Sequence, residues 1–301
     1  MWKKVLSNSL FYKYRAPNGA DTLGNICRID LNQMLCRPWN ICALSIALLV
    51  LAFPATLVPS SPPAHAKLRV MTYNIHVGVG MDKKLDLQRI ADVINQEHPD
   101  LVGLQEVDRG VKRTEGLDEI AELARMTKME YAFAHNLDYQ GGQYGVAILS
   151  RFTILKVDHR KYENKREAER RGMIRIEVKV NNRTLSFATT HLDYQYEDGR
   201  VFETEQLLEF LRDQTGPLIV VGDFNEEPKG DAYKLMMPKF EDAWFRSNAK
   251  GDGLSYPADK PAKRIDYIFY RANGGVRAKR ARVVNTLASD HVPVVADLEI
   301  R

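Results

Sequence analysis

Short apolar runs alternate with amphipathic stretches from Leu68 onward, a pattern that indicates strands and helices in turn. The clearest helix is predicted at Leu87–Glu97, where Asp86 offers an N-cap and several apolar side chains share one face. Further helices are predicted at Asp118–Thr127 and Arg200–Arg212. Strands are predicted at Leu68–Tyr73, Leu101–Gln105, Val146–Leu149, Met173–Val180, Thr184–Thr190, Pro217–Val221, Ile265–Tyr270, Val276–Asn285 and Val292–Ile300.

The order of these elements predicts an α/β fold. Asn181-Asn182 between two predicted strands is a hairpin turn signal, so a purely parallel sheet is excluded. No repeat, low-complexity stretch or Gly/Ser-rich linker divides Leu68–Arg301. We therefore predict one domain over residues 67–301, with two mixed sheets packed together and covered by helices.

Residues 1–66 indicate a leader. Ile41–Phe53 is an uncharged run of 13 residues, and Ala64-His65-Ala66 later has the small-x-small pattern of a signal-peptidase site. We expect cleavage after Ala66 and export to the periplasm or the medium. The alternative is a membrane anchor formed by Ile41–Phe53, although a typical span needs ~20 apolar residues. Met34 is a more natural start for such a leader than Met1.

Charge and cysteine content change at the same point. The first 66 residues hold six basic and two acidic residues, so the remaining 235 hold 37 of each and are formally neutral. Proteins that grip long duplex DNA through its phosphates usually have a basic surplus, so the net charge gives no support for nucleic-acid binding. Cys27, Cys36 and Cys42 all lie in the leader, which excludes a disulfide or thiolate metal site in the domain.

Polar residues recur where the apolar strands end. Taken singly, such a carboxylate is usually a cap or turn residue, and such a histidine is more often structural than catalytic. A whole series beside strongly apolar strands is harder to explain as turns. The series is Asn74, Glu106, His191, Asp223, Asn225, Asp266, Asp290 and His291.

The motifs around these residues resemble the endonuclease/exonuclease/phosphatase superfamily, whose members hydrolyse phosphoester bonds. The resemblance extends from Arg69 to Leu298 and implies a four-layer α/β/β/α sandwich, in agreement with the predicted strands. The motifs are GDFN at Gly222–Asn225, SDH at Ser289–His291, LQEV at Leu104–Val107 and GVAILSR at Gly145–Arg151.

A divalent metal site with oxygen ligands is part of what the resemblance implies. Glu106 would be the main ligand, helped by Asn74 and by Asp290. Carboxylate and amide oxygens suit Mg²⁺ or Mn²⁺, which usually keep part of their water shell.

The resemblance also implies which residues act on the water and the phosphate. His291 would be the general base, with its ring oriented by Asp266. Asp223 and Asn225 would position the water and the phosphate. His191 stands where relatives carry a His or Tyr that donates to the phosphoryl group or the leaving oxygen.

Two further residues are candidates for binding the substrate. His76 follows Asn74 by two positions and on a continuing strand would point to the same face; the alternative is a turn residue before Gly78. Arg171 precedes a predicted strand and could offer its guanidinium group to phosphate oxygens. A charged run such as Lys165–Arg171 is, however, more often a solvated loop.

Three functions remain open. The first is an exported, monomeric phosphodiesterase or phosphatase acting on a small or lipid-derived phosphoester, with membrane contact only through an uncleaved leader. The second is a secreted nuclease degrading DNA or RNA. Its nearest basic cluster is Arg277, Lys279, Arg280 and Arg282, which alternation along a strand would divide between two faces. The third, a binding domain without activity, is disfavoured because every expected site position is filled.

Overall fold

The computed structural model describes residues 65–301. The predicted apolar run Ile41–Phe53 and Ala64 of the cleavage site lie outside these residues. The expected cleavage point follows Ala66, which is the first residue of strand β1. No helix within residues 65–301 is long and apolar enough to cross a membrane.

The described residues form two mixed six-stranded sheets. The first has the order β11-β12-β1-β2-β4-β3 and the second β5-β6-β7-β8-β10-β9; β1 with β2 and β7 with β8 are parallel pairs. The strands are β1 (Ala66–Asn74), β2 (Leu101–Arg109), β3 (Glu130–Tyr139), β4 (Gly142–Ser150), β5 (Lys156–Lys161), β6 (Gly172–Val180), β7 (Arg183–His191), β8 (Leu218–Asp223), β9 (Phe240–Asp242), β10 (Asp266–Arg271), β11 (Val276–Val283) and β12 (Val294–Ile300). The helices are η1 (His76–Gly78), α1 (Leu87–Glu97), η2 (Lys112–Thr114), α2 (Glu119–Thr127), α3 (Glu197–Phe210), α4 (Asp231–Met236) and α5 (Ala243–Arg246).

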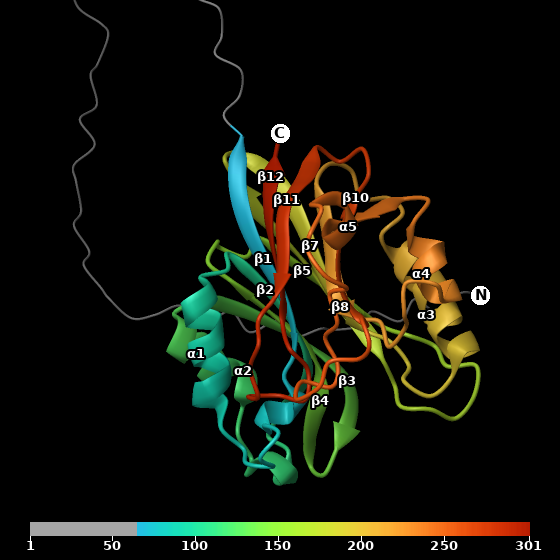
Figure 1. The fold of residues 1–301 in the computed structure, drawn as a ribbon. Helices are drawn as coiled ribbons and strands as arrows, with labels where there is room; N and C mark the ends of the chain where they lie inside the picture. The colour runs from blue at the N-terminus through green and yellow to red at the C-terminus, as the bar shows by residue number, and fades with distance from the viewer. Residues whose placement is uncertain (1–64) are drawn as a thin grey trace, which may run out of the picture. The chain divides into compact units, whose positions relative to one another are not determined.

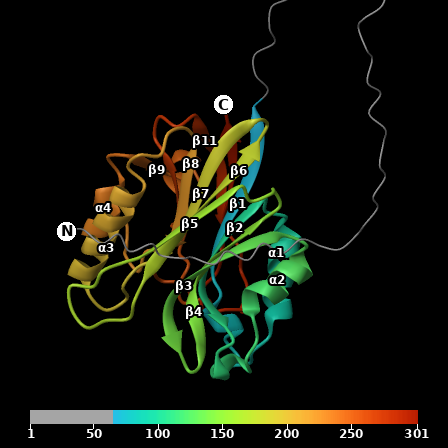
Figure 2. The same ribbon diagram turned by 180° about the vertical axis from the view of Figure 1, so that it is seen from behind.

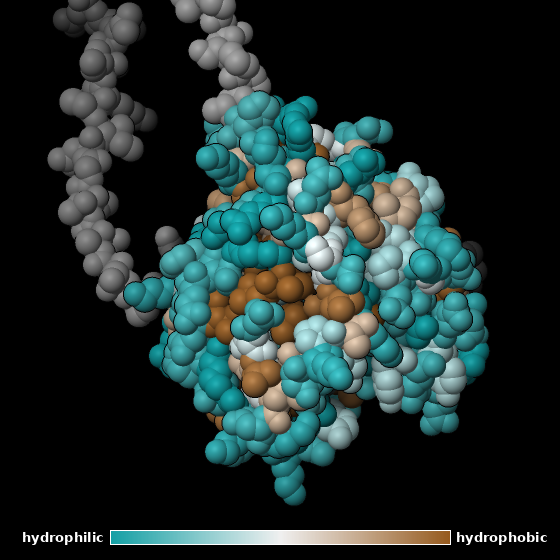
Figure 3. Space-filling model, viewed as in Figure 1, coloured by the Kyte–Doolittle hydropathy of each residue, from teal (hydrophilic) through white to brown (hydrophobic). Residues whose placement is uncertain are grey.

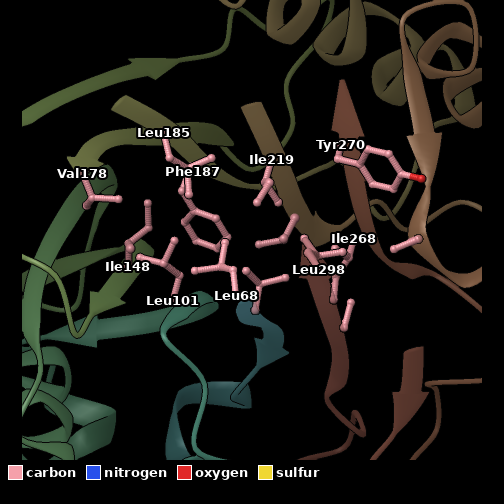
Figure 4. Packing of buried hydrophobic residues seen from close by; sticks show 14 of the residues in the cluster. Leu68, Leu101, Ile148, Val178, Leu185, Phe187, Ile219, Ile268, Tyr270 and Leu298 are labelled. Carbon is pink, nitrogen blue, oxygen red and sulfur yellow. The ribbon is translucent and has the colours of Figure 1, made fainter. Parts of the chain in front are cut away.

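The main hydrophobic core lies between the two sheets (Figure 4). Leu68, Leu101 and Ile148 of the first sheet are buried together with Phe187 and Ile219 of the second. These positions follow the period of two that strands impose on side-chain direction. Burial of each such side chain stabilises the fold by about 1.5–3 kcal/mol.

Helices cover the outer faces of both sheets (Figures 1 and 2). α1 and α2 pack Ile90, Ile94 and Ile120 on the first sheet, and α3 and α4 pack Leu207 and Met236 on the second. The predicted four-layer α/β/β/α sandwich is therefore confirmed. The face of the molecule seen in Figure 3 is largely hydrophilic, with an apolar area beside α1.

Most predicted elements are present, with differences at their ends. α1 has the predicted bounds, and the Asp86 carboxylate accepts two backbone N–H groups of its first turn. Asn181-Asn182 joins β6 to β7 with positive φ at both residues. α3 spans Glu197–Phe210 rather than Arg200–Arg212, because acidic side chains favour its first turn.

The four basic residues of the edge strand β11 were expected to divide between the two faces of the strand. A β-bulge makes that expectation wrong. The register against β12 shifts between Ala278 and Arg280, which leaves Lys279 as an extra residue. Ala278 and Ala281, three positions apart, consequently both face the core between the sheets. The four basic side chains of the strand therefore lie together on its outer face and are not divided.

Candidate functional site

Residues from four neighbouring strands of the second sheet form a row where those strands begin or end. In the backbone register, Gly172 of β6 lies opposite His191 of β7, His191 opposite Asp223 of β8, and Asp223 opposite Asp266 of β10. The parallel strands β7 and β8 end at this row, and the antiparallel strands β6 and β10 begin there. The polar residues at these strand ends are therefore neighbours in space.

Asn74 connects the first sheet to this row. It is the last residue of β1 and is fully buried. Its Nδ2 atom donates to Glu106 Oε1 and to Asp223 Oδ2, both at 3.0 Å. Beside it, Gln105 Nε2 donates to Thr189 Oγ1 at 2.7 Å, a second buried link between the sheets. The site is thus built across the interface of the two sheets.

Glu106 reaches the site because of a second β-bulge. The register of β2 against β4 shifts between Leu104 and Val107, and Glu106 adopts a left-handed backbone with φ of 56°. A non-glycine residue at such a φ is unfavourable, and strain of this kind concentrates at functional sites. The bulge brings the Glu106 carboxylate to Asn74.

His291 lies between two carboxylates. Its Nδ1 atom is 2.9 Å from Asp266 Oδ2 and its Nε2 atom is 3.6 Å from Asp223 Oδ2, with all three side chains at most 6% exposed. Burial opposes the imidazolium, but the two carboxylates outweigh it and raise the pKa of His291 to about 10. Burial and repulsion from Asp266 raise the pKa of Asp223 to about 7. The neighbouring carboxylates therefore favour a proton on His291.

His191 stands between Arg171 and the same carboxylate row. Arg171 Nη1 is 2.7 Å from His191 Nδ1. On the other side of the ring, Nε2 is 3.5 Å from Asp223 Oδ2 and 3.1 Å from Asn225 Nδ2. Burial and the Arg171 charge lower the pKa of His191 well below its usual value. Both effects favour the neutral ring.

His76 and Asp290 are the more exposed members of the site. β1 ends at Asn74, so the expectation that His76 continues that strand is wrong; it starts η1 with φ of 45°. His76 Nδ1 is 3.1 Å from the Val79 carbonyl oxygen and 3.8 Å from Asp290 Oδ1. Ser289 Oγ donates to the Asn74 carbonyl at 2.8 Å, which holds the Asp290 segment against β1.

Three side chains of the site were not among the predicted residues. The Tyr256 ring centroid is 4.8 Å from that of His291. Glu169 Oε1 and Tyr144 Oη are 3.0 Å and 3.3 Å from Arg171 Nη1. Tyr256 lies in an irregular loop before β10, which has no periodic pattern to reveal it. Glu169 is part of a charged run that indicates a solvated loop.

The site has the donors that a hard divalent cation prefers. Ligand atoms of Asp223, Asp266 and His291 all lie within 4.8 Å of one another. Asp266 Oδ1 is buried without a hydrogen-bond partner, and repulsion between the two carboxylates leaves negative charge that a cation would neutralise. Glu106, bonded through Asn74 to Asp223, adds another carboxylate to this cluster. The residues present therefore fit Mg²⁺ or Mn²⁺.

Known proteins share both sequence and fold with the chain. Residues 71–291 match the model of the Endonuclease/Exonuclease/phosphatase family. The uncharacterized protein YbhP of Escherichia coli K12 is 26% identical over 250 residues, which are 77% of this chain and 96% of that protein. A solved structure of an endonuclease/exonuclease/phosphatase family protein from Bacteroides thetaiotaomicron has a TM-score of 0.68 at 19% identity, over 79% of this chain and 99% of that one. A mannosyl-6-phosphatase from Bacteroides thetaiotaomicron VPI-5482 has a TM-score of 0.64 at 19% identity, over 77% and 99%.

Proposed function

The chain belongs to the endonuclease/exonuclease/phosphatase family of phosphoesterases, and from that premise we propose that it is an exported, metal-dependent phosphodiesterase or phosphatase. Its substrate is a small or lipid-derived phosphoester. The observation that carries the proposal is the buried His291, bonded to Asp266 through one nitrogen and facing Asp223 with the other. This arrangement suits a base that takes a proton from water beside a phosphate.

In the proposed reaction His291 accepts the proton of the attacking water at Nε2. Asp266 accepts the hydrogen bond from Nδ1–H, which fixes the tautomer and stabilises the imidazolium that forms. Asp223 and Asn225 position the water and the phosphate, and His191 donates to a phosphoryl or leaving-group oxygen. Asp223, Asp266 and His191 lie at strand ends, Asn225 directly follows β8, and His291 lies in the loop before β12, so the sheets hold their geometry.

The proposed cofactor is Mg²⁺ or Mn²⁺. Glu106, Asn74 and Asp290 would hold it, next to the buried carboxylates of the second sheet. When bound, such an ion supplies positive charge that polarises the phosphoryl group and opposes the proton on His291.

A small substrate is supported by the neutral charge of residues 67–301 and by the fold shared with a mannosyl-6-phosphatase. One observation favours a nuclease instead, since the bulge in β11 gathers four basic side chains on one face. Two of them already have acidic partners, Lys279 with Glu299 at 3.2 Å and Arg282 with Glu97. The basic surplus available to a nucleic acid is therefore small.

Export and cleavage after Ala66 are proposed from the leader alone. The small residues Ala64 and Ala66 meet the requirement of the peptidase. The mature protein would then act as a monomer in the periplasm or the medium. Retention of Ile41–Phe53 would make it membrane-anchored instead.

A substrate panel tests the activity. The purified protein is assayed with Mg²⁺ or Mn²⁺ against bis(p-nitrophenyl) phosphate, inositol phosphates, sphingomyelin and plasmid DNA. We expect turnover of a small or lipid ester and its loss in His291→Ala, with His159→Ala, an exposed histidine of β5, as the control. Cleavage of plasmid DNA in preference to the other substrates would support the nuclease. Undiminished turnover by His291→Ala would rule out the proposed base.

A further inference from the structure

We propose that Arg171 fixes the tautomer of His191 and thereby makes His191 Nε2 a hydrogen-bond donor to the substrate phosphoryl group. The inference rests on the proposed phosphoesterase reaction. It makes Arg171 a positioning residue that acts through His191, in place of the direct phosphate contact expected from the sequence.

The first step follows from hydrogen-bond chemistry. A guanidinium group has only donors, and it keeps its charge in proteins. Arg171 Nη1 lies 2.7 Å from His191 Nδ1, so Nδ1 must present its lone pair. This contact opposes both the imidazolium and the tautomer with hydrogen on Nδ1. The tautomer that satisfies Arg171 has its single ring hydrogen on Nε2.

The second step is that Arg171 is held in place behind the histidine. Its side chain is 4% exposed, and Nη1 also contacts Glu169 Oε1 at 3.0 Å and Tyr144 Oη at 3.3 Å. Its guanidinium carbon lies 5.8 Å from the centroid of the Tyr194 ring. A side chain with these partners stays behind His191 and is not free to turn toward a substrate.

The third step concerns the opposite edge of the ring. Asn225 Nδ2 donates to the Leu192 carbonyl at 3.0 Å, which sets the orientation of that amide. The same Nδ2 lies 3.1 Å from His191 Nε2, so Asn225 is a second donor that competes with Arg171 for the one lone pair of the ring. Arg171 is charged and closer, at 2.7 Å, so it takes the lone pair and leaves the ring N–H beside the second hydrogen of the amide. The acceptor in front of Nε2 is Asp223 Oδ2 at 3.5 Å, beyond a normal hydrogen bond. An oxygen with two lone pairs, such as a phosphoryl oxygen, suits this pair of donors.

Nuclear magnetic resonance measures the tautomer without reference to activity. The chain has seven histidines, so protein labelled with ¹⁵N-histidine gives few ring signals, and His191→Gln identifies that of His191. We expect the wild-type signal of hydrogen on Nε2. Arg171→Met should give a mixture or the other tautomer, and Arg171→Lys, which keeps a donor-only cation, should largely restore the wild-type signal.

Arg175 provides the matched control. It lies in β6, four residues after Arg171, and is 2% exposed, but its partners are Ser186, Glu177 and Asp158. Arg175→Met should leave the His191 tautomer unchanged. Hydrogen on Nδ1 in the wild type, or a tautomer unaffected by Arg171→Met, would overturn the proposal. The wild-type spectrum alone decides if Arg171→Met does not fold.

Kinetics then separate indirect from direct action. We expect Arg171→Met to lower kcat by roughly 10²-fold, in the range for loss of one oxyanion donor. Added to His191→Ala, it should cost nothing more, because both changes remove the same donor. A further loss in the double variant would show that Arg171 contacts the substrate itself. A correct tautomer in a protein that hydrolyses none of the phosphoesters would refute the proposed function alone.

Discussion

Replacement of Asp266 by Asn tests the pair on which the proposed reaction depends. The carboxylate accepts the His291 Nδ1–H at 2.9 Å inside the protein. Asn has nearly the same volume, but it can turn its NH₂ group toward Nδ1. The ring hydrogen would then move to Nε2, the atom that must accept the proton of water.

The structure indicates the size of the effect. Asp266 and Asp223 raise the pKa of His291 against the opposing effect of burial, so both carboxylates stabilise its imidazolium form. Loss of Asp266 removes the larger of these attractions. A positioned general base is worth roughly 10²–10⁴-fold in rate, so kcat should fall within that range. KM should change little, because Asp266 is buried behind the ring.

Steady-state kinetics of Asp266→Asn, His291→Ala and the double variant provide the test. Because the two residues act as a unit, the double variant should be scarcely slower than His291→Ala. Asp138→Asn is the control, since Asp138 forms an exposed pair with His135 at 3.0 Å. Losses that multiply would show that Asp266 and His291 work separately, and the base would then be sought elsewhere.

Three more outcomes are expected. EDTA should abolish turnover and Mg²⁺ or Mn²⁺ restore it, and Glu106→Gln should raise the metal concentration required; full activity in EDTA would contradict this. Burial raises the pKa of Glu119 from 4.5 to about 8 in the folded protein. Between these two pH values the unfolded chain has lost the proton that the folded protein keeps, so the free energy of unfolding should fall as pH rises from about 4.5 to 8. Thermal unfolding at several pH values should show a smaller fall of stability with pH in Glu119→Gln than in the wild type. Glu122→Gln, a more exposed position of α2, should show the wild-type fall. Equal pH slopes in the wild type and Glu119→Gln would refute the assignment. Mass spectrometry of the exported protein should find Lys67 as its first residue, whereas a chain retaining Ile41–Phe53 would be an anchored one.

Elements with strong periodic burial could be predicted from sequence, and those without it could not. α1 repeats its apolar side chains every three or four residues and was predicted to the residue. β3 turns Ala132, Ala134 and Asn136 inward, and such small or polar side chains give little apolar signal. β5, with the sequence KVDHRK, is an edge strand whose residues are largely exposed.

The site was predictable where a polar residue directly follows a buried strand. Asp223 and His191 are found this way because strand ends share an edge of the sheet. Their partners are fixed by tertiary packing, which no local pattern encodes. Arg171 is 20 residues from His191, and only the β6–β7 hairpin brings them together. Tyr256 reaches His291 from a loop, so its place depends on the folded chain.

The two hydrogen bonds of Asn74 have a consequence for when the protein becomes active. One reaches Glu106, 32 residues away in the same sheet, and the other reaches Asp223, 149 residues away in the opposite sheet. Neither sheet contains a complete site, so docking of the two sheets and formation of the site are one event. With His291 as the proposed base, a growing chain should remain inactive until His291 has been added, and activity should be lost in the same cooperative transition as the core. Catalytic competence is thus a property of the fully closed sandwich and of no smaller folding unit.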